Sequence, residues 1–93
     1  MRFEWDDAKA AANLEKHGLS FVAAARVFND RGRWREESTR PEYGERRWKA
    51  VGVVDDTVIA VVFTIRDGTC RIISARRARA NERAEYHRRH PAS

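Results

Sequence analysis

Two short turns do most to constrain how this chain folds. Asp55-Asp56 and Asp67-Gly68 interrupt a stretch rich in β-branched residues and leave three strand-like runs, Glu45–Val54, Thr57–Arg66 and Thr69–Arg76. Asp-Gly is a strong signal for a two-residue hairpin loop, and Asp-Asp is a fair one. Two-residue loops fix the register, so the sequence predicts an antiparallel meander with two pairs beside its turns, Val54 with Thr57 and Arg66 with Thr69.

The residues before the meander follow helical patterns. Asp6 can cap a first helix that continues to about Asn13 and ends at His17-Gly18, where glycine suits the left-handed position. Ser20 can cap a second helix, because four apolar residues recur after it at helical spacing: Phe21, Ala24, Ala25 and Phe28. Two further short strands and a loop before the meander are also predicted: Phe3–Trp5, Arg33–Ser38 and residues 40–44.

The C-terminal segment is rich in helix formers. It predicts a helix from Ala78 to about Arg89 that stops at Pro91. A chain of 93 residues, 42% of them hydrophobic, fits one domain and leaves no room for a second core. We therefore expect a single α+β domain over residues 1–93, with an antiparallel sheet of three to four strands packed on the N-terminal helices and with a C-terminal helix.

The predicted register sorts the side chains of the meander onto two faces. One face holds a cross-strand row of large apolar residues and four more beside it, which the helices are expected to cover: Trp48, Phe63 and Ile72, with Ile59, Val61, Ile65 and Cys70. The other face is polar. It is expected to carry Glu45 opposite Arg66, then the row Arg47, Thr64 and Arg71, and then Lys49 beside Val62 and Ile73.

One carboxylate among four cations is the unusual property of that polar face. Glu45 would stand with Arg47, Lys49, Arg66 and Arg71. A half-exposed antiparallel sheet often has a solvated polar face, so a purely structural interpretation is at least as good as a functional one. Like charges on neighbouring strands repel, however, and a bound anion would relieve that imbalance. A one-residue slip in either hairpin would move Glu45 to the apolar side.

The location of the charge also indicates an anionic partner. The net charge is +5, and basic and acidic residues balance each other up to Cys70. The excess lies beyond Cys70, where seven arginines face Glu82 and Glu85, so that 7 − 2 = +5: Arg71, Arg76, Arg77, Arg79, Arg83, Arg88 and Arg89. Arginine suits bidentate contacts with phosphate, which favours RNA as the partner, although a solvated helix face can have the same composition.

Several classes of protein are disfavoured. Cys70 is the single cysteine, which excludes an internal disulfide, indicates a small buried residue and suits a reducing cytoplasm. The N-terminus lacks an apolar signal segment, and the longest apolar run, Val58–Phe63, is too short to span a membrane. His17, His87 and His90 include one i, i+3 pair but no Asp, Glu or Cys cluster that would complete a metal site, and phosphate-loop, serine-hydrolase and Cys-x-x-Cys motifs are missing. We therefore expect no metal and no cofactor.

The remaining polar residues suit metal-free cleavage of RNA. In that reaction the ribose 2′-hydroxyl attacks its own phosphate, and the enzyme supplies a base, an acid and positive charge around phosphorus. Glu45 is the candidate base, although Arg66 beside it would lower its pKa and weaken it. The other candidates are Arg66, Arg71 and Arg76 for charge stabilisation, His17 or Lys16 as acid, and Arg46, Arg47, Lys49, Arg71 and Arg77 for RNA binding. His17 could instead interact with the carbonyls that end its helix.

A set of short motifs from Phe3 to Tyr86 resembles one known family. The motifs are Phe3-Glu4-Trp5-Asp6, Lys9, Asn13, Lys16-His17-Gly18, Ser20-Phe21, Val27-Phe28, Glu45-Arg46, Gly52, Val62-Phe63-Thr64-Ile65-Arg66, residues 71–78, Glu82-Arg83 and Tyr86. In this order they are similar to the BrnT toxins. The resemblance implies a RelE-like fold and a cytoplasmic ribonuclease toxin of a type II toxin–antitoxin pair that inhibits translation.

The resemblance also implies a protein partner. It would be a BrnA-like antitoxin with a ribbon-helix-helix part, in a hetero-oligomer that contacts DNA only through the antitoxin. Two positions depart from the family pattern: Asp7 stands where relatives often have proline, and Thr39-Arg40-Pro41 stands where similar proteins often have a histidine. No catalytic histidine is therefore expected in the loop before Glu45, and the proton donor stays open.

Two other interpretations stay open at this level. The chain could be a basic nucleic-acid-binding module without catalysis, in which Arg71 binds and Glu45 has no chemical role. The C-terminal helix could also be chiefly a docking surface for an acidic partner protein, which is compatible with a toxin.

Overall fold

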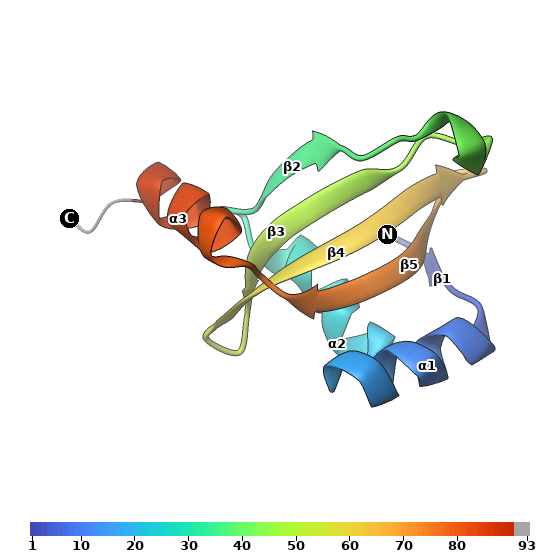
Figure 1. The fold of residues 1–93 in the computed structure, drawn as a ribbon, viewed down its shortest axis with the longest axis horizontal. Helices are drawn as coiled ribbons and strands as arrows, with labels where there is room; N and C mark the ends of the chain where they lie inside the picture. Colours follow the sequence, from blue (N-terminus) through green and yellow to red (C-terminus); the bar gives the residue numbers. More distant parts are fainter. Residues whose placement is uncertain (91–93) are drawn as a thin grey trace.

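The computed structural model describes residues 1–90 and has an α+β fold built on one sheet (Figure 1). Within these residues the strands are β1 (Phe3–Glu4), β2 (Trp34–Glu37), β3 (Trp48–Val54), β4 (Thr57–Arg66) and β5 (Thr69–Arg77), in the order β1-β5-β4-β3-β2. The helices are α1 (Asp7–His17), α2 (Phe21–Ala25) and α3 (Ala80–Arg89), with two 3-10 turns, η1 (Arg26–Asn29) and η2 (Pro41–Tyr43). No helix in this range is both long and apolar enough to cross a membrane.

The predicted α+β class is confirmed, but the predicted sheet of three to four antiparallel strands is wrong. The sheet has five strands, and β1 runs parallel to β5. β1 has only two residues and no tight turn connects it to β5, so its pairing depends on the tertiary structure. The C-terminal helix ends at Arg89, and the predicted stop at Pro91 lies outside the described residues.

Both predicted hairpins form with two-residue loops. The φ angles are 50° and 64° at Asp55 and Asp56, and 50° and 78° at Asp67 and Gly68. Two successive positive φ angles give the mirror-image turn whose twist matches that of the flanking strands. The predicted pairs form, and so does the predicted row across β3, β4 and β5: Val54 with Thr57, Arg66 with Thr69, and Trp48 with Phe63 and Ile72.

α1 is fixed at its ends and in its middle. Asp6 accepts a hydrogen bond from the N–H of Lys9, and Gly18 ends the helix with a φ of 67°. The buried Asn13 side chain donates to the carbonyl of Ala75 at 2.8 Å and accepts from the N–H of Ala75 at 3.0 Å. β1 pairs only with the start of β5, so the backbone of Ala75 has no strand partner on that side. The side-chain amide of Asn13 satisfies the N–H and the carbonyl of Ala75 instead.

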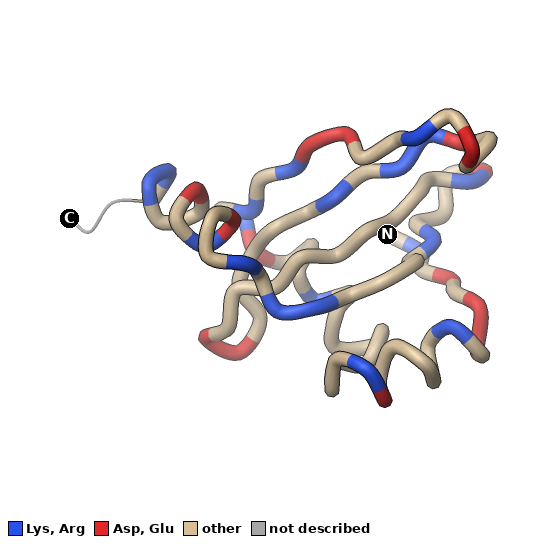
Figure 2. Tube along the Cα trace, viewed as in Figure 1, with Lys and Arg blue, Asp and Glu red and all other residues tan. Residues whose placement is uncertain are grey.

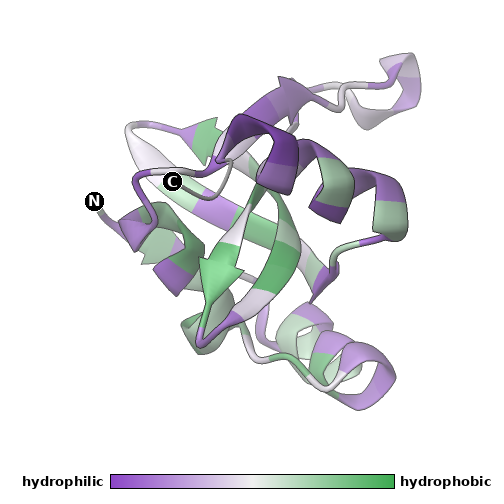
Figure 3. Ribbon diagram, turned by 90° about the vertical axis from the view of Figure 1, so that its left-hand side faces the viewer, coloured by the Kyte–Doolittle hydropathy of each residue, from purple (hydrophilic) through white to green (hydrophobic). Residues whose placement is uncertain are grey.

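Helices cover the two faces of the sheet at different places, with hydrophobic strands between them (Figure 3). α1, α2 and η1 lie on the face predicted to be apolar, over a core that includes Phe21, Val27, Phe63 and Ile72. We call it the helix-side face. Ile65, which was predicted to belong to this covered surface, is 52% exposed because it borders an open hollow rather than a helix.

The opposite face also has a covered apolar part at one end, which was not predicted. α3 covers one end of it over a second apolar cluster that consists of Trp34, Val51, Val58, Ala60 and Ala78. This cover comes from the chain beyond the meander, so the register of the hairpins could not predict it. In the described part of the chain, the remainder of this face carries no helix (Figure 1).

Asp30 ties α3 to the sheet. Its carboxylate accepts hydrogen bonds from the N–H of Val53 at 2.8 Å and from the hydroxyl of Tyr86 at 2.7 Å. Burial acts to raise the pKa of Asp30, but these donors outweigh it and lower that pKa, while burial and Asp30 raise the pKa of Tyr86 to about 12. Gly52 leaves room for this contact, since a Cβ there would lie 3.0 Å from Oδ2 of Asp30.

A β-bulge in β5 decides which arginines reach the face that carries α3. Val62 pairs with Ser74 and Phe63 with Ile72, so Ile73 has no residue opposite it, and the predicted position of Ile73 beside Val62 is wrong. One extra residue reverses the facing of the strand beyond it. Arg76 therefore pairs with Ala60 and faces α3, whereas without the bulge it would lie opposite Ile59 on the helix-side face.

Candidate functional site

The uncovered polar part of the sheet carries the candidate site, and we call it the open face. It is defined by residues of β1, β3, β4 and β5 that alternate with the helix-side core: Glu4, Lys49, Thr64, Arg66 and Arg71. Figure 2 shows basic positions along β3, at the end of β4 and on β5. Cationic side chains from neighbouring strands of one sheet are therefore within reach of one polyanionic ligand.

Glu45 lies between two arginines at one end of the open face. Its Oε1 is 2.7 Å from a guanidinium nitrogen of Arg66, and its Oε2 is 3.1 Å from Nε of Arg47. Hydrogen bonds from Arg66 and then from Arg47 lower the pKa of Glu45, as the sequence predicted for Arg66. Glu45 is thus ionised at neutral pH, as a proton acceptor must be.

The segment before β3 brings Glu45 to this place. Pro41 starts η2, and Gly44 ends it with a φ of 66°, directly before Glu45. The hydroxyl of Thr64 donates to the carbonyl of Arg46 at 2.6 Å and so fixes the segment against β4. β3 itself begins only at Trp48, three residues later than predicted, yet the predicted contact of Glu45 with Arg66 is present.

A second carboxylate cluster lies where α3 meets the same face. Glu82 is 2% exposed and accepts two hydrogen bonds from Arg76, at 2.7 and 3.0 Å, and it lies 2.7 Å from Nζ of Lys49. It also accepts from the N–H of Arg79 at 2.8 Å, which caps the helix. Burial acts to raise the pKa of Glu82, but Arg76, the N–H of Arg79 and Lys49 together lower it to about 2.

The predicted imbalance of one carboxylate among four cations is wrong. Arg71 lies 3.6 Å from Glu4 on β1, and Lys49 lies 2.9 Å from Glu36 on β2 as well as near Glu82. Each cation of the open face therefore has a carboxylate partner in the free chain. These carboxylates come from β1, β2 and α3, which the register of the meander does not place.

The two candidate acids lie elsewhere. His17, at the end of α1, borders a hollow together with Thr57 and Arg77. Thr57 begins β4 and Arg66 ends it, so roughly 30 Å of strand separates His17 from the Glu45 cluster. The structure does not bring His17, or Lys16 beside it, to Glu45.

The candidate RNA-binding residues divide between the faces. Arg47, Lys49 and Arg71 lie on the open face. Arg46 instead pairs with Glu37 at 2.9 Å and covers the ring of Trp48, on the helix-side face. Arg77 is exposed and borders the hollow of His17.

Glu82 is one of the carboxylates of this site that were not predicted, and the sequence contained a signal for it. A glutamate at the third position of a helix, reaching back to the first free N–H groups, is a recognisable cap. The helix was predicted to start at Ala78, two residues before the observed start at Ala80, so Glu82 was not recognised as its third residue.

The described residues contain neither a cluster of metal ligands nor an accessible thiol. Residues 1–90 contain no cluster of three His, Cys, Asp or Glu side chains that could hold a metal ion. Cys70 is fully buried, as predicted, and burial raises the pKa of its thiol to about 11.

A protein-family model matches residues 5–82 of the chain. The family is described as ribonuclease toxin, BrnT, of type II toxin-antitoxin system. The chain belongs to the BrnT family. Comparison with curated proteins finds no match.

Membership of the BrnT family confirms the resemblance seen in the sequence. It makes the chain a member of a family of ribonuclease toxins, and a type II system includes an antitoxin partner. The matched residues include Glu45 and Glu82, and end in the first turn of α3.

Proposed function

We propose that this BrnT-family chain is an endoribonuclease that cleaves RNA on its open face without a metal ion and thereby inhibits translation. RNA phosphates displace Glu45 from Arg66 and Glu4 from Arg71, whereas the buried pair of Arg76 with Glu82 stays in place. Glu45 is the base, Arg66 and Arg71 contact the reacting phosphate, and Arg76 stabilises charge from its position beside Lys49.

The proposed reaction is an internal transesterification. Glu45 takes the proton of the ribose 2′-hydroxyl, whose oxygen forms a bond to phosphorus while the bond from phosphorus to the 5′-oxygen breaks. The leaving 5′-oxygen takes a proton from water, the hydroxide so formed takes back the proton that Glu45 carries, and the product is a 2′,3′-cyclic phosphate. Cations around phosphorus stabilise the charge that develops there, which is the largest contribution expected in such a site.

The difference in exposure within the Glu45 cluster carries this proposal. The side chain of Glu45 is 19% exposed, whereas that of Arg66 is 51% exposed. A solvated ion pair of this kind is weak and exchanges partners easily. When a phosphate draws Arg66 away, Glu45 loses the contact that lowers its pKa most, so its basicity rises when substrate is bound.

The proposal is tested with purified toxin and a synthetic RNA. Glu45→Gln should slow cleavage by about 10²- to 10⁴-fold, because the base is lost, with little change in Tm. Glu42→Gln is the matched control, since Glu42 is exposed and lies in the neighbouring turn η2. Cleavage should persist with EDTA and should stop when the ribose at the cut site lacks its 2′-hydroxyl. Unchanged cleavage by Glu45→Gln would refute the assigned base.

One observation favours the alternative, a nucleic-acid-binding module without catalysis. Glu45 has a lowered pKa in the free chain and is therefore a weak base. Under that alternative, Glu45→Gln leaves growth arrest unchanged, while Arg71→Ala weakens RNA binding and reduces its salt dependence.

The partner and setting complete the proposal. We infer that residues 1–93 form one domain, that a ribbon-helix-helix antitoxin of the BrnA type neutralises it in a cytoplasmic hetero-oligomer, and that DNA is contacted only through the antitoxin. Expression of the chain alone should arrest bacterial growth, and co-expression of the antitoxin encoded with it should restore growth. Growth that continues without the antitoxin would contradict the toxic function.

A further inference from the structure

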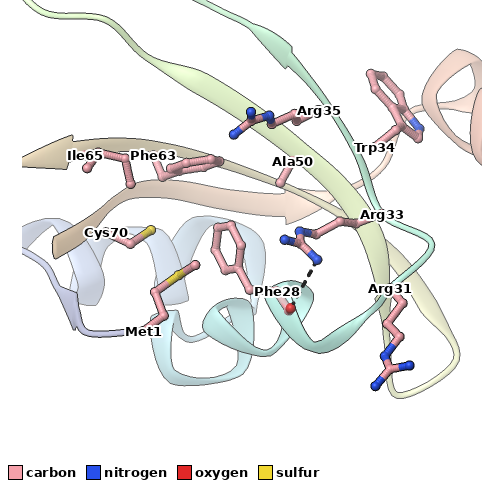
Figure 4. Close-up of a pocket in the computed structure, with 10 residues that line it drawn as sticks. All are labelled: Met1, Phe28, Arg31, Arg33, Trp34, Arg35, Ala50, Phe63, Ile65 and Cys70. Atoms are coloured by element: carbon pink, nitrogen blue, oxygen red, sulfur yellow. Dashed lines mark hydrogen bonds between the residues drawn. The ribbon is translucent and has the colours of Figure 1, made fainter. Parts of the chain in front are cut away.

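An apolar hollow lies on the helix-side face, away from the Glu45 cluster (Figure 4). Its volume is about 330 Å³, and Phe28, Ala50 and Phe63 are among the residues that line it. Ile65, 52% exposed, and Met1, 78% exposed, also border it. Exposed aliphatic side chains around a concave apolar surface are typical of a binding site.

Arginines stand beside this hollow without acidic partners. Figure 4 shows the guanidinium groups of Arg33 and Arg35 extending along the hollow, with Arg31 pointing away. Within residues 1–90 neither Arg33 nor Arg35 forms an ion pair. Arg33 donates instead to the carbonyls of Phe28 and Asp30, at 3.3 and 3.2 Å. The hollow therefore offers positive charge that the chain itself does not neutralise, unlike the open face.

The surface suits a protein segment better than RNA. Bases bind single-stranded RNA sites by stacking on free aromatic rings. Here Arg33 lies over the ring of Phe28, with 5.6 Å between guanidinium carbon and ring centroid, and Arg35 lies over Trp48 at 5.1 Å. Phe63 is 4% exposed, whereas the aliphatic side chains of Met1 and Ile65 at the edge of the hollow are exposed. Aliphatic surface beside unpaired arginines complements a segment that alternates apolar and acidic side chains.

We infer that this hollow is the docking surface for an acidic, amphipathic segment of the antitoxin. One apolar side chain of that segment enters the hollow against Phe28 and Ile65, and its carboxylates pair with Arg33 and Arg35. The inference rests on the proposed function only in taking the antitoxin as the partner. It places the contact on the opposite side of the sheet from the Glu45 cluster.

The experiment measures binding of the purified antitoxin to purified toxin variants by calorimetry at two salt concentrations. Arg33→Ala with Arg35→Ala should weaken binding about tenfold and reduce its salt dependence, because two interfacial charges are removed. Ile65→Ser should weaken it about fivefold through lost apolar contact, without a change in salt dependence. The matched control is Arg40→Ala with Arg79→Ala, two exposed arginines that do not border the hollow.

The outcomes separate this inference from the proposed function. Equal weakening by the test and control pairs, unchanged binding in both test variants, or a wild-type toxin that does not bind the antitoxin would each overturn it. Loss of RNA cleavage in the test variants with normal antitoxin binding would assign the hollow to RNA and also overturn it. If wild-type toxin does not cleave RNA while the hollow variants still bind the antitoxin more weakly, only the proposed catalysis fails.

Discussion

Glu45 and Glu82 occupy the same face of the sheet, and each is held by two cations. Glu82, in the first turn of α3, is 2% exposed and contacts Arg76 and Lys49. Glu45 lies beyond the cover of α3, and its partner Arg66 is half-exposed. The chemical groups are nearly the same, so the difference between the two clusters comes from what covers them.

Under the proposed function, this difference separates a structural carboxylate, Glu82, from the proposed base, Glu45. Removing one member of a buried ion cluster leaves charges without partners in a medium that solvates them poorly, so Glu82 holds Arg76 and Lys49 in fixed positions. Water can replace either partner in an exposed pair, so Arg66 is able to exchange Glu45 for a phosphate. We therefore expect the Glu82 cluster to hold part of the site in place, and we propose that the Glu45 cluster does the chemistry.

The largest expected effect on stability comes from Glu82. Glu82→Ala should lower the free energy of unfolding by about 3 kcal/mol, because Arg76 and Lys49 lose their shared partner and the N–H of Arg79 loses its acceptor. Thermal unfolding should show a fall in Tm of about 10–20 °C. Glu85→Ala, on the exposed side of the same helix, should lower Tm far less. Equal falls in both variants would remove the distinction between the clusters.

Acid should affect the buried cluster next. The pKa of Glu82 is lowered from 4.5 to about 2, so its ionised form stabilises the fold above pH 4.5, and this contribution is lost as pH falls toward 2. Between pH 5 and pH 2 the free energy of unfolding, measured with urea, should therefore fall more for the wild type than for Glu82→Gln. The variant has no carboxylate at this position to bind a proton. Parallel curves for the two proteins would show that Glu82 is not held as described.

The hydroxyl of Tyr86 should have a smaller effect. Tyr86→Phe removes the hydrogen bond to Asp30 that helps to hold α3 against the sheet, and it should cost about 1–2 kcal/mol in the free energy of unfolding. Tyr43→Phe is the control, because the Tyr43 ring lies under Arg47 without a hydrogen bond from its hydroxyl among the described residues. Hydrogen exchange in α3 should rise in the first variant only, and equal exchange in both would argue against this anchor.

The smallest effect on stability is expected at the exposed cluster. Arg66→Ala should leave Tm within about 2 °C of the wild type, because water replaces the lost partner of Glu45. RNA cleavage should nevertheless fall by about 10- to 10³-fold, since a charge beside the phosphate is lost. A large fall in Tm without any loss of cleavage would reverse the roles assigned to the two clusters.

Parts of the candidate site followed from the sequence because local geometry fixes them. The contact of Glu45 with Arg66 depends on the register of one hairpin, and that hairpin depends on two turn residues, Asp55 and Asp56. The bulge at Ile73 was not predicted, although it decides that Arg76 faces Glu82. A bulge adds one residue without a clear turn signal, so an alternation pattern alone does not place it.

The sequence by itself determined the two hairpins, the caps of α1 and the family, because each depends on residues close together in the chain or on a pattern along it. Only the tertiary structure decided that β1 pairs in parallel, that α3 covers one end of the second face and that Glu4, Glu36 and Glu82 neutralise the cations there. Ion pairs form between whichever charges the fold brings together. Their partners therefore follow from long-range packing, as does the cover that makes one carboxylate structural and leaves the other available for chemistry.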